Sequence, residues 1–274
     1  MNEEVLSGGS MTAVVRVGET VRRTAGPWTP TVHELLRHLR ASGFDRVPEP
    51  LGIDDRGREI LSLLPGKVAT YPLPAFAWSD ATLRAVAGTL RAYHDASAAF
   101  EAPAEAVWQW PAHRPAEVIC HNDFAPYNLM FEDGVLTGVI DFDLASPGPR
   151  IWDIAEAAYR FVPLTSPANP DAPSPGADQQ ARRLEAFCSA YGDPRITPPD
   201  VVETAIDKIT ELLDFIEREA AAGDPAQQAV LARGDVDIYR RDVEYLERSF
   251  RCAVARPPLS TAASASLLHG TARW

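Results

Sequence analysis

Apolar side chains recur every three or four residues in four separate stretches of the chain, which is the spacing of the buried face of an α-helix. The stretches cover residues 31–42, 79–100, 200–222 and 235–253. Pro30 precedes the first stretch and Ser79 opens the second, and both residue types favour helix N-termini. The pattern therefore predicts four helices, the last two of which close the chain.

Shorter apolar runs bounded by turn residues predict β-strands near the N-terminus. Residues 5–24 are expected to form three short strands, separated by Gly8-Gly9-Ser10 and by Gly18-Glu19. Residues 58–66 predict a further strand that runs into a Pro-Gly break. A small sheet followed by helices is therefore expected in this part of the chain.

A β-hairpin is predicted around Asp133-Gly134, because this dipeptide favours tight two-residue turns. The flanking strands are expected at residues 128–131 and 135–142. Such a hairpin brings Asn128 and Asp141 to the same end of the ribbon. Amide and carboxylate oxygens placed in this way can share a divalent cation.

The segment that contains this hairpin, residues 118–143, sets His121, Asp123, Asn128 and Asp141 in a distinctive order. Transfer of the γ-phosphoryl group of ATP to a hydroxyl needs a carboxylate that orients and deprotonates the acceptor, and oxygen ligands for Mg²⁺. Asp123 can supply the carboxylate, while Asn128 and Asp141 can supply the ligands. Taken singly, each residue has an ordinary interpretation as a turn cap or strand end. Their order and spacing together favour phosphoryl transfer.

Two stretches within and just beyond this segment, HNDFAPYNLMF and VIDFDLASPGPRIWDIA, resemble the aminoglycoside phosphotransferase family. This family is the antibiotic-kinase branch of the protein-kinase-like fold, which also holds choline and homoserine kinases. The resemblance implies that Asp123 is the catalytic base and that Asn128 and Asp141 hold Mg²⁺. It also implies that His121 braces the catalytic loop.

Two further aspartates near these motifs are expected to support the site. Asp153, in the WDIA stretch, matches a buried aspartate that steadies this region in the family. Asp143 lies two residues beyond Asp141, and on a continued strand the two side chains would share one face. We expect neither Asp153 nor Asp143 to take part in the chemistry itself.

The N-terminal sheet departs from the family at the residues that hold the phosphates. In the family a lysine of this sheet holds the α- and β-phosphates of ATP, and a glutamate of the following helix braces it. Here the third strand offers Arg22 and Arg23, and the helix has His33 near the position of the glutamate. We expect Arg23 to replace the lysine, because a guanidinium can bind phosphate through two donors. His33 is either a surface residue or a brace.

Other nucleotide contacts are expected from backbone groups. The backbone amides of Gly8 and Gly9 and the hydroxyl of Ser10 can approach phosphate oxygens, as in glycine-rich loops. A plain hairpin turn is an equal alternative for this stretch. The resemblance places the hinge between two lobes at the Pro-Gly break, where adenine would contact the backbone near Ser62 and Leu64.

These features together predict an α+β fold of the protein-kinase-like, two-lobed type. A small N-terminal β-sheet lobe, residues 1–66, is expected to bind the nucleotide. A larger and mainly helical C-terminal lobe, residues 67–274, is expected to carry the catalytic residues and the acceptor site.

Composition and charge narrow the possible partners. With 274 residues, 46% of them hydrophobic, the chain can bury a large core. The formal net charge of -12 argues against nucleic acid as a partner, because phosphate contacts need clustered Lys and Arg. The same charge favours a cationic acceptor.

The three cysteines, Cys120, Cys188 and Cys252, are far apart, and a Cys-x-x-Cys pair is missing, so we expect reduced and buried thiols. No apolar run approaches the length of a membrane span, and the first ten residues lack the apolar core of a signal peptide. These features predict a cytoplasmic protein without a membrane partner.

The sequence therefore predicts an ATP- and Mg²⁺-dependent phosphotransferase that acts on a hydroxyl of a small molecule, for example an aminoglycoside. The alternative is a nucleotide-binding regulatory pseudokinase without turnover, which the missing lysine and glutamate favour. The intact Asp123, Asn128 and Asp141 argue against this alternative.

Two surface features bear on the acceptor. Acidic residues of the predicted helix 200–222, among them Asp207 and Glu211, either form a solvated face or line the acceptor cleft. The proline-rich residues 163–177 predict a long irregular loop, which is either a lid over the acceptor or a spacer.

Overall fold

This computed structural model describes residues 3–6, 14–172 and 175–251 of the chain. Its N-terminal part is a five-stranded antiparallel sheet. The strands lie in the order β1-β2-β3-β5-β4 and span Glu4–Leu6, Val14–Val17, Thr20–Thr24, Arg58–Ser62 and Pro50–Ile53 respectively. Helix α1 (Thr29–Ala41) follows β3 and buries the predicted apolar residues, from Val32 to Leu39. The expected turn Gly8-Gly9-Ser10 lies outside the described residues.

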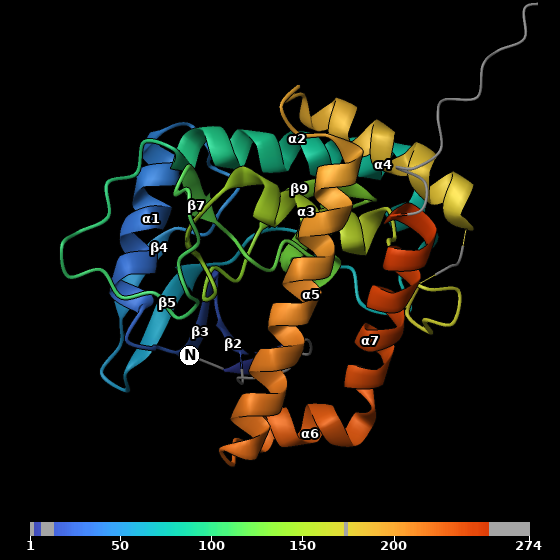
Figure 1. Cartoon of the computed structure of the whole chain (residues 1–274). Coiled ribbons are helices and arrows are strands. Elements are labelled where there is room, and N and C mark those ends of the chain that lie inside the picture. The colour runs from blue at the N-terminus through green and yellow to red at the C-terminus, as the bar shows by residue number, and fades with distance from the viewer. Residues whose placement is uncertain (1–2, 7–13, 173–174, 252–274) are drawn as a thin grey trace, which may run out of the picture.

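Helices make up most of the C-terminal part (Figure 1). They are α2 (Asp80–Ser97), α3 (Arg150–Phe161), α4 (Ala177–Tyr191), α5 (Pro198–Ala221), α6 (Pro225–Arg233) and α7 (Asp235–Leu246), which continues into a π-helical turn, Glu247–Arg251. Helix α3 packs on α5, and α2 packs on α4. Helix α6 joins α5 to α7, and α7 also packs on α5. Among the described residues no helix is both long and apolar enough to cross a membrane.

The apolar pattern predicted some of these helices and missed others. Helix α2 begins where expected, because the Ser79 hydroxyl accepts a hydrogen bond from the amide of Thr82 at 3.1 Å. Helices α3, α4 and α6 were not predicted. Helix α6 buries no residue, so it lacks the one-sided apolar stripe that reveals a surface helix. Helix α3 is buried around most of its circumference.

Two small sheets carry residues 118–148, which contain the residues predicted to be catalytic and are called the catalytic segment below. Strands β6 (Lys67–Val68), β8 (Leu129–Glu132) and β9 (Val135–Val139) form one, and β7 (Val118–Cys120) pairs with β10 (Ser146–Gly148) in the other. The predicted hairpin is present, with positive φ angles at Asp133 and Gly134. The prediction of strand up to residue 142 is wrong, because β9 ends at Val139 and Asp141 has a φ of 66°. The left-handed backbone at Asp141 breaks the strand alternation.

The chain crosses from the first sheet to the second between Ser62 and Lys67. Gly66 is required there, because a Cβ atom at this residue would lie 2.5 Å from the backbone oxygen of Phe131. Its φ of 99° also disfavours any side chain. The strand predicted at residues 58–66 thus ends at Ser62, and the division into lobes near residue 66 stays a prediction.

The first part of the proline-rich segment is packed against α7. Leu164 is fully buried, and the carboxylate of Asp242 accepts hydrogen bonds from the Ser166 amide and the Asn169 side chain, both at 2.7 Å. These contacts exclude a spacer role for residues 163–169. Cys120 and Cys188 are buried free thiols, as predicted, and Cys252 lies outside the described residues.

A buried carboxylate joins α2 and α3 to the loop after β7. The Asp153 side chain is fully buried and accepts hydrogen bonds from the amides of His121 (2.6 Å) and Asn122 (2.7 Å). It also accepts one from His94 Nε2 at 3.1 Å, and His94 Nδ1 contacts the hydroxyl of Tyr191 at 2.9 Å. Burial would raise the pKa of Asp153, but the hydrogen bond and charge of His94 and nearby cations outweigh it, so the pKa is lowered.

We expect Asp153→Asn to lower the free energy of unfolding by about 3 to 5 kcal/mol, because two buried amides and His94 lose their charged acceptor. Urea unfolding at pH 7 measures the change. The control is Asp207→Asn on the exposed face of α5, which should stay within about 0.5 kcal/mol of the wild type.

The pH dependence of the unfolding free energy provides a second test of Asp153. Because the pKa of Asp153 is lower in the folded state, its stabilisation is present above the unfolded pKa and is lost as the pH falls through the folded one. The gap between wild type and Asp153→Asn should therefore narrow in acid. A constant gap would rule out an ionised Asp153.

Candidate active site

His121 ties the loop after β7 to the end of the hairpin. Its fully buried ring donates from Nε2 to the backbone oxygen of Ile140 at 3.0 Å. The other nitrogen, Nδ1, is then free to accept the amide hydrogen of Asp123 at 3.3 Å. The ring thus lies where a brace of the catalytic loop is expected, and the backbone of Asp123 is one of its two partners.

The carboxylate of Asp123 is held by two neighbours on its own loop. Its Oδ1 accepts from the hydroxyl of Tyr127 at 2.7 Å, and its Oδ2 accepts from Asn128 Nδ2 at 2.8 Å. Burial, followed by the negative charge of Glu156, raises the pKa of Asp123, while Arg160 and Tyr127 oppose the rise. A partly exposed carboxylate with a raised pKa, in fixed orientation, has the properties of a general base.

The two predicted metal ligands lie on neighbouring strand ends. The backbone oxygen of Asn128 accepts from the amide of Ile140 at 2.9 Å, so Asp141 follows directly after this contact. Asn128 Nδ2 is bound to Asp123, which leaves its amide oxygen as the possible ligand. The side chain of Asp141 is 46% exposed. Two oxygen donors fit Mg²⁺, which keeps several waters and takes its other ligands from phosphates.

No group of three or more His, Cys, Asp or Glu side chains is arranged to hold a metal in the described part of the chain. The predicted Mg²⁺ ligands are only two side chains, the amide of Asn128 and the carboxylate of Asp141, so they do not form such a group.

Arg23 reaches from β3 to the catalytic segment. Its Nη1 donates to Asp141 Oδ1 at 2.6 Å and its Nη2 to Asp143 Oδ1 at 2.7 Å, while its Nε donates to Glu59. Burial alone would lower the pKa of Arg23, but the three carboxylates raise it further above its usual value. Burial raises the pKa of Asp143 to about 6 against the attraction of Arg23. The arginine is thus fully ionised and next to a predicted metal ligand.

Sequence reasoning underrated Asp143 and missed Glu59. Asp143 contacts Arg23 directly, although no continued strand places it beside Asp141. Glu59 follows Arg23 by 36 positions in the chain, and only the pairing of β3 with β5 reveals that they meet. The alternation along β5, with Glu59 on the buried face, was the available signal.

The predicted adenine contacts lie in the crossing between the sheets. The Ser62 amide donates to the Glu49 oxygen at 2.9 Å, and its hydroxyl accepts from the Glu49 amide at 2.8 Å. A contact of adenine with Ser62 would therefore use the backbone oxygen. Leu64 lies against Gly138 of β9, where an added Cβ would come within 2.7 Å of it.

A cavity of about 230 Å³ opens beside Asp123. Its aromatic lining consists of Trp110, Tyr127, Trp152, Tyr159 and Tyr239. Its charged lining consists of Asp123, Glu156, Arg160, Lys208 and Glu211. A hydroxyl-bearing molecule in this cavity would lie next to the carboxylate of the expected base.

Partners within the cavity leave some polar groups for a ligand. Glu156 accepts from Arg160 Nε at 3.0 Å and lies 3.8 Å from Lys208 Nζ, so it is neutralised by two cations. Two other buried lining atoms, Asn122 Oδ1 and Trp152 Nε1, have no hydrogen-bond partner. A buried acceptor and a buried donor without partners are costly unless a ligand or water satisfies them.

The acidic face of α5 divides between cavity and solvent. Glu211 lines the cavity, and its Oε2 contacts His113 Nε2 at 2.9 Å. Asp207 is exposed and does not line the cavity. On this face, Glu211 therefore lies at the cavity and Asp207 lies on the solvated side.

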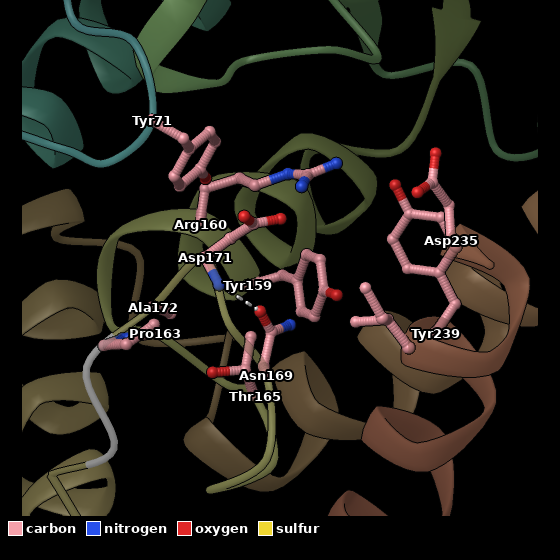
Figure 2. Close-up of a pocket in the computed structure, with 11 residues that line it drawn as sticks. Tyr71, Tyr159, Arg160, Pro163, Thr165, Asn169, Asp171, Ala172, Asp235 and Tyr239 are labelled. Atoms are coloured by element: carbon pink, nitrogen blue, oxygen red, sulfur yellow. Dashed lines mark hydrogen bonds between the residues drawn. The ribbon is translucent and has the colours of Figure 1, made fainter. Parts of the chain in front are cut away.

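Figure 2 shows the lining of a second cavity, of about 120 Å³. The two share Tyr159, Arg160 and Tyr239 as a common wall. Residues of the proline-rich segment, including Asn169 and Asp171, line the second cavity. This segment therefore borders the region next to the acceptor cavity, and its role as a lid stays a prediction.

Comparisons with known proteins show what this chain resembles. Residues 78–198 match the sequence model described as the phosphotransferase enzyme family. The trifolitoxin immunity protein of Rhizobium leguminosarum bv. trifolii is 39% identical over 166 residues, which cover 58% of this chain and 62% of that protein. The alignment thus spans less than two thirds of this relative.

Two solved structures resemble the whole described chain. A choline/ethanolamine kinase family protein from Mesorhizobium loti has a TM-score of 0.60 at 14% identity and covers 92% of this chain and 90% of its own. An amicoumacin kinase in complex with AMP-PNP, Ca²⁺ and Ami has a TM-score of 0.61 at 15% identity and covers 90% and 88%.

These likenesses confirm the predicted α+β, two-lobed kinase-like fold, with an antiparallel sheet in the N-terminal part and helices in the C-terminal part. The resemblance stated from the motifs is confirmed as well: the segment 78–198, which contains His121, Asp123, Asn128 and Asp141, matches the phosphotransferase enzyme family.

Proposed function

We propose that this protein is an ATP- and Mg²⁺-dependent phosphotransferase that moves the γ-phosphoryl group to a hydroxyl of a small molecule. The observation that carries the proposal is the carboxylate of Asp123, which borders a cavity and is fixed by Tyr127 and Asn128. Burial raises the pKa of Asp123, which makes the carboxylate a stronger base than an exposed aspartate. The family of the segment 78–198 supports the reaction type.

In this reaction the acceptor hydroxyl lies in the cavity of about 230 Å³ and hydrogen-bonds to Asp123. Its oxygen forms a bond to the γ-phosphorus while the bond from phosphorus to the β,γ-bridging oxygen breaks, and the hydroxyl proton passes to Asp123. Asn128 and Asp141 would hold Mg²⁺, which neutralises charge on the phosphates. Arg23, which already contacts Asp141, would bind phosphate oxygens from the N-terminal sheet.

One observation favours the pseudokinase alternative. Arg23, which we expect to replace the lysine of the family, donates to three carboxylates. Calorimetric titration with ATP and Mg²⁺ separates the alternatives when combined with an ATPase assay with and without candidate acceptors. Nucleotide binding without turnover of any acceptor would favour the pseudokinase.

For the acceptor we infer a cationic, antibiotic-type compound with a free hydroxyl. Glu211 and Asp123 offer carboxylates to the cavity, and neither forms an ion pair with a Lys or Arg among the described residues. The aromatic lining suits ammonium groups. The immunity protein and the amicoumacin kinase point to toxins and antibiotics as a class. With ATP as donor, the reaction belongs in the cytoplasm. A mass-spectrometric screen of acceptor libraries with ATP would identify the compound.

We expect Asp123→Asn to reduce kcat by about 10²- to 10⁴-fold, because the acceptor loses its base. The affinity for Mg·AMP-PNP, measured by calorimetry, should change by no more than a few-fold, since Asp123 borders the acceptor cavity and touches the predicted metal site only through its hydrogen bond with Asn128. Asp207→Asn serves as the matched control. Normal turnover of Asp123→Asn would refute the assignment.

The pH profile should respond to the neighbours of Asp123. The base works as a carboxylate, so kcat/KM falls as the pH drops through its raised pKa. Glu156→Gln removes a charge that raises this pKa and should move the acid limb to lower pH. Tyr127→Phe removes a hydrogen bond that lowers it and should move the limb to higher pH. Shifts of both variants in the same direction would show that another group titrates.

Charge reversal on α5 tests the acceptor site. Glu211→Lys should raise the KM for a cationic acceptor by about tenfold, because Glu211 lines the cavity. Asp207→Lys makes the same change of charge on the solvent side and should leave KM unchanged. Equal effects of the two variants would indicate long-range attraction instead of a contact in the cavity.

A further inference from the structure

Glu59 and Arg23 stand directly opposite each other in the antiparallel pairing of β3 and β5. Side chains of opposite residues share one face of the sheet, with Cβ atoms about 5 Å apart. Only 1% of Glu59 and 9% of Arg23 is exposed, and Glu59 Oε1 accepts from Arg23 Nε. A buried carboxylate is thus built into the sheet beside the arginine that we expect to bind phosphate.

The second oxygen of this carboxylate is held from the helix. His33 of α1 is 4% exposed, and its Nε2 lies 3.0 Å from Glu59 Oε2. Because a carboxylate can only accept, His33 Nε2 is the donor. Both oxygens of Glu59 therefore have a buried partner, one on β3 and one on α1, which settles His33 as a buried contact and not a surface residue.

In the family pattern, a glutamate on the helix holds a lysine on the strand. Here the carboxylate, Glu59, lies on the sheet beside Arg23, and the helix contributes His33, which holds Glu59. With its Nε held by Glu59, the guanidinium can turn only its Nη1 and Nη2 toward the catalytic segment, where they meet Asp141 and Asp143. We propose that Glu59, locked by His33, is the positioning residue that holds the phosphate-binding edge of Arg23 toward the nucleotide. The proposal rests on the proposed function.

Arg22 provides a matched control on the same strand. Successive strand residues point to opposite faces, and Arg22 Nη1 donates to Thr20 Oγ1 at 2.6 Å while its Nε lies 4.0 Å from Asp54. It has the same charge as Arg23 and a neighbouring position, but no contact with Glu59, Asp141 or Asp143 is present in the described structure.

The test is calorimetric titration of Mg·AMP-PNP into the full chain, with thermal unfolding of each variant as a check on folding. Glu59→Gln should raise the dissociation constant by about tenfold, and His33→Gln should raise it by a few-fold, because Arg23 loses its fixed orientation. Arg22→Gln should stay within about twofold of the wild type.

A double-mutant cycle separates positioning from a general structural effect. If Glu59 acts through Arg23, the double variant Arg23→Gln with Glu59→Gln should bind Mg·AMP-PNP no more weakly than Arg23→Gln alone. Additive losses would overturn the proposal. If Glu59→Gln does not fold, His33→Gln leaves the ion pair in place, and an unchanged dissociation constant in that variant would overturn it instead.

Binding of Mg·AMP-PNP by the wild type distinguishes failure of the proposed function from failure of the role of Glu59. A wild type that does not bind Mg·AMP-PNP overturns the proposed function and the role of Glu59 with it. A wild type that binds and turns over while Glu59→Gln binds equally well overturns only the role of Glu59.

Discussion

The position of the catalytic loop depends on one buried carboxylate that accepts two consecutive backbone amides. Asp153 binds the amides of His121 and Asn122, and Asn122 has a φ of 65°, a left-handed conformation that costs energy without compensating contacts. The side chain of Asn122 adds hydrogen bonds to Leu144 O and Ser146 Oγ. Asp123 is the next residue, so these contacts of its neighbours position its backbone, while its own hydrogen bonds with Tyr127 and Asn128 orient the carboxylate.

A second constraint joins the two halves of the site through charge. The sheet contributes Arg23 and the catalytic segment contributes Asp141 and Asp143, so ion pairs cross from one to the other. Low solvent exposure around the guanidinium strengthens these pairs but also makes removal of any one partner costly. The nucleotide site that we infer is therefore assembled around an arginine whose orientation is determined by the sheet, with the helix acting on it through His33.

The sequence predicted those parts of the site that are local in the chain. Each of these signals acts over a few residues. The Asp133-Gly134 turn and the Ser79 cap predicted local structure, and the spacing of His121, Asp123 and Asn128 predicted the chemistry. Other parts depend on tertiary structure. The contact of Arg23 with Glu59 requires the register of two strands, and the end of β9 depends on a left-handed residue that no apolar pattern reveals. Helix α6 buries no residue, so the chain carries no apolar stripe from which to predict it.

The most direct test is a crystal structure of the protein with Mg²⁺ and AMP-PNP. We expect the metal between the side-chain oxygens of Asn128 and Asp141, Arg23 on a phosphate oxygen, and the γ-phosphate facing Asp123 across the mouth of the cavity. A nucleotide bound elsewhere, or a metal without contact to Asn128 and Asp141, would contradict the assignment of this site to phosphoryl transfer.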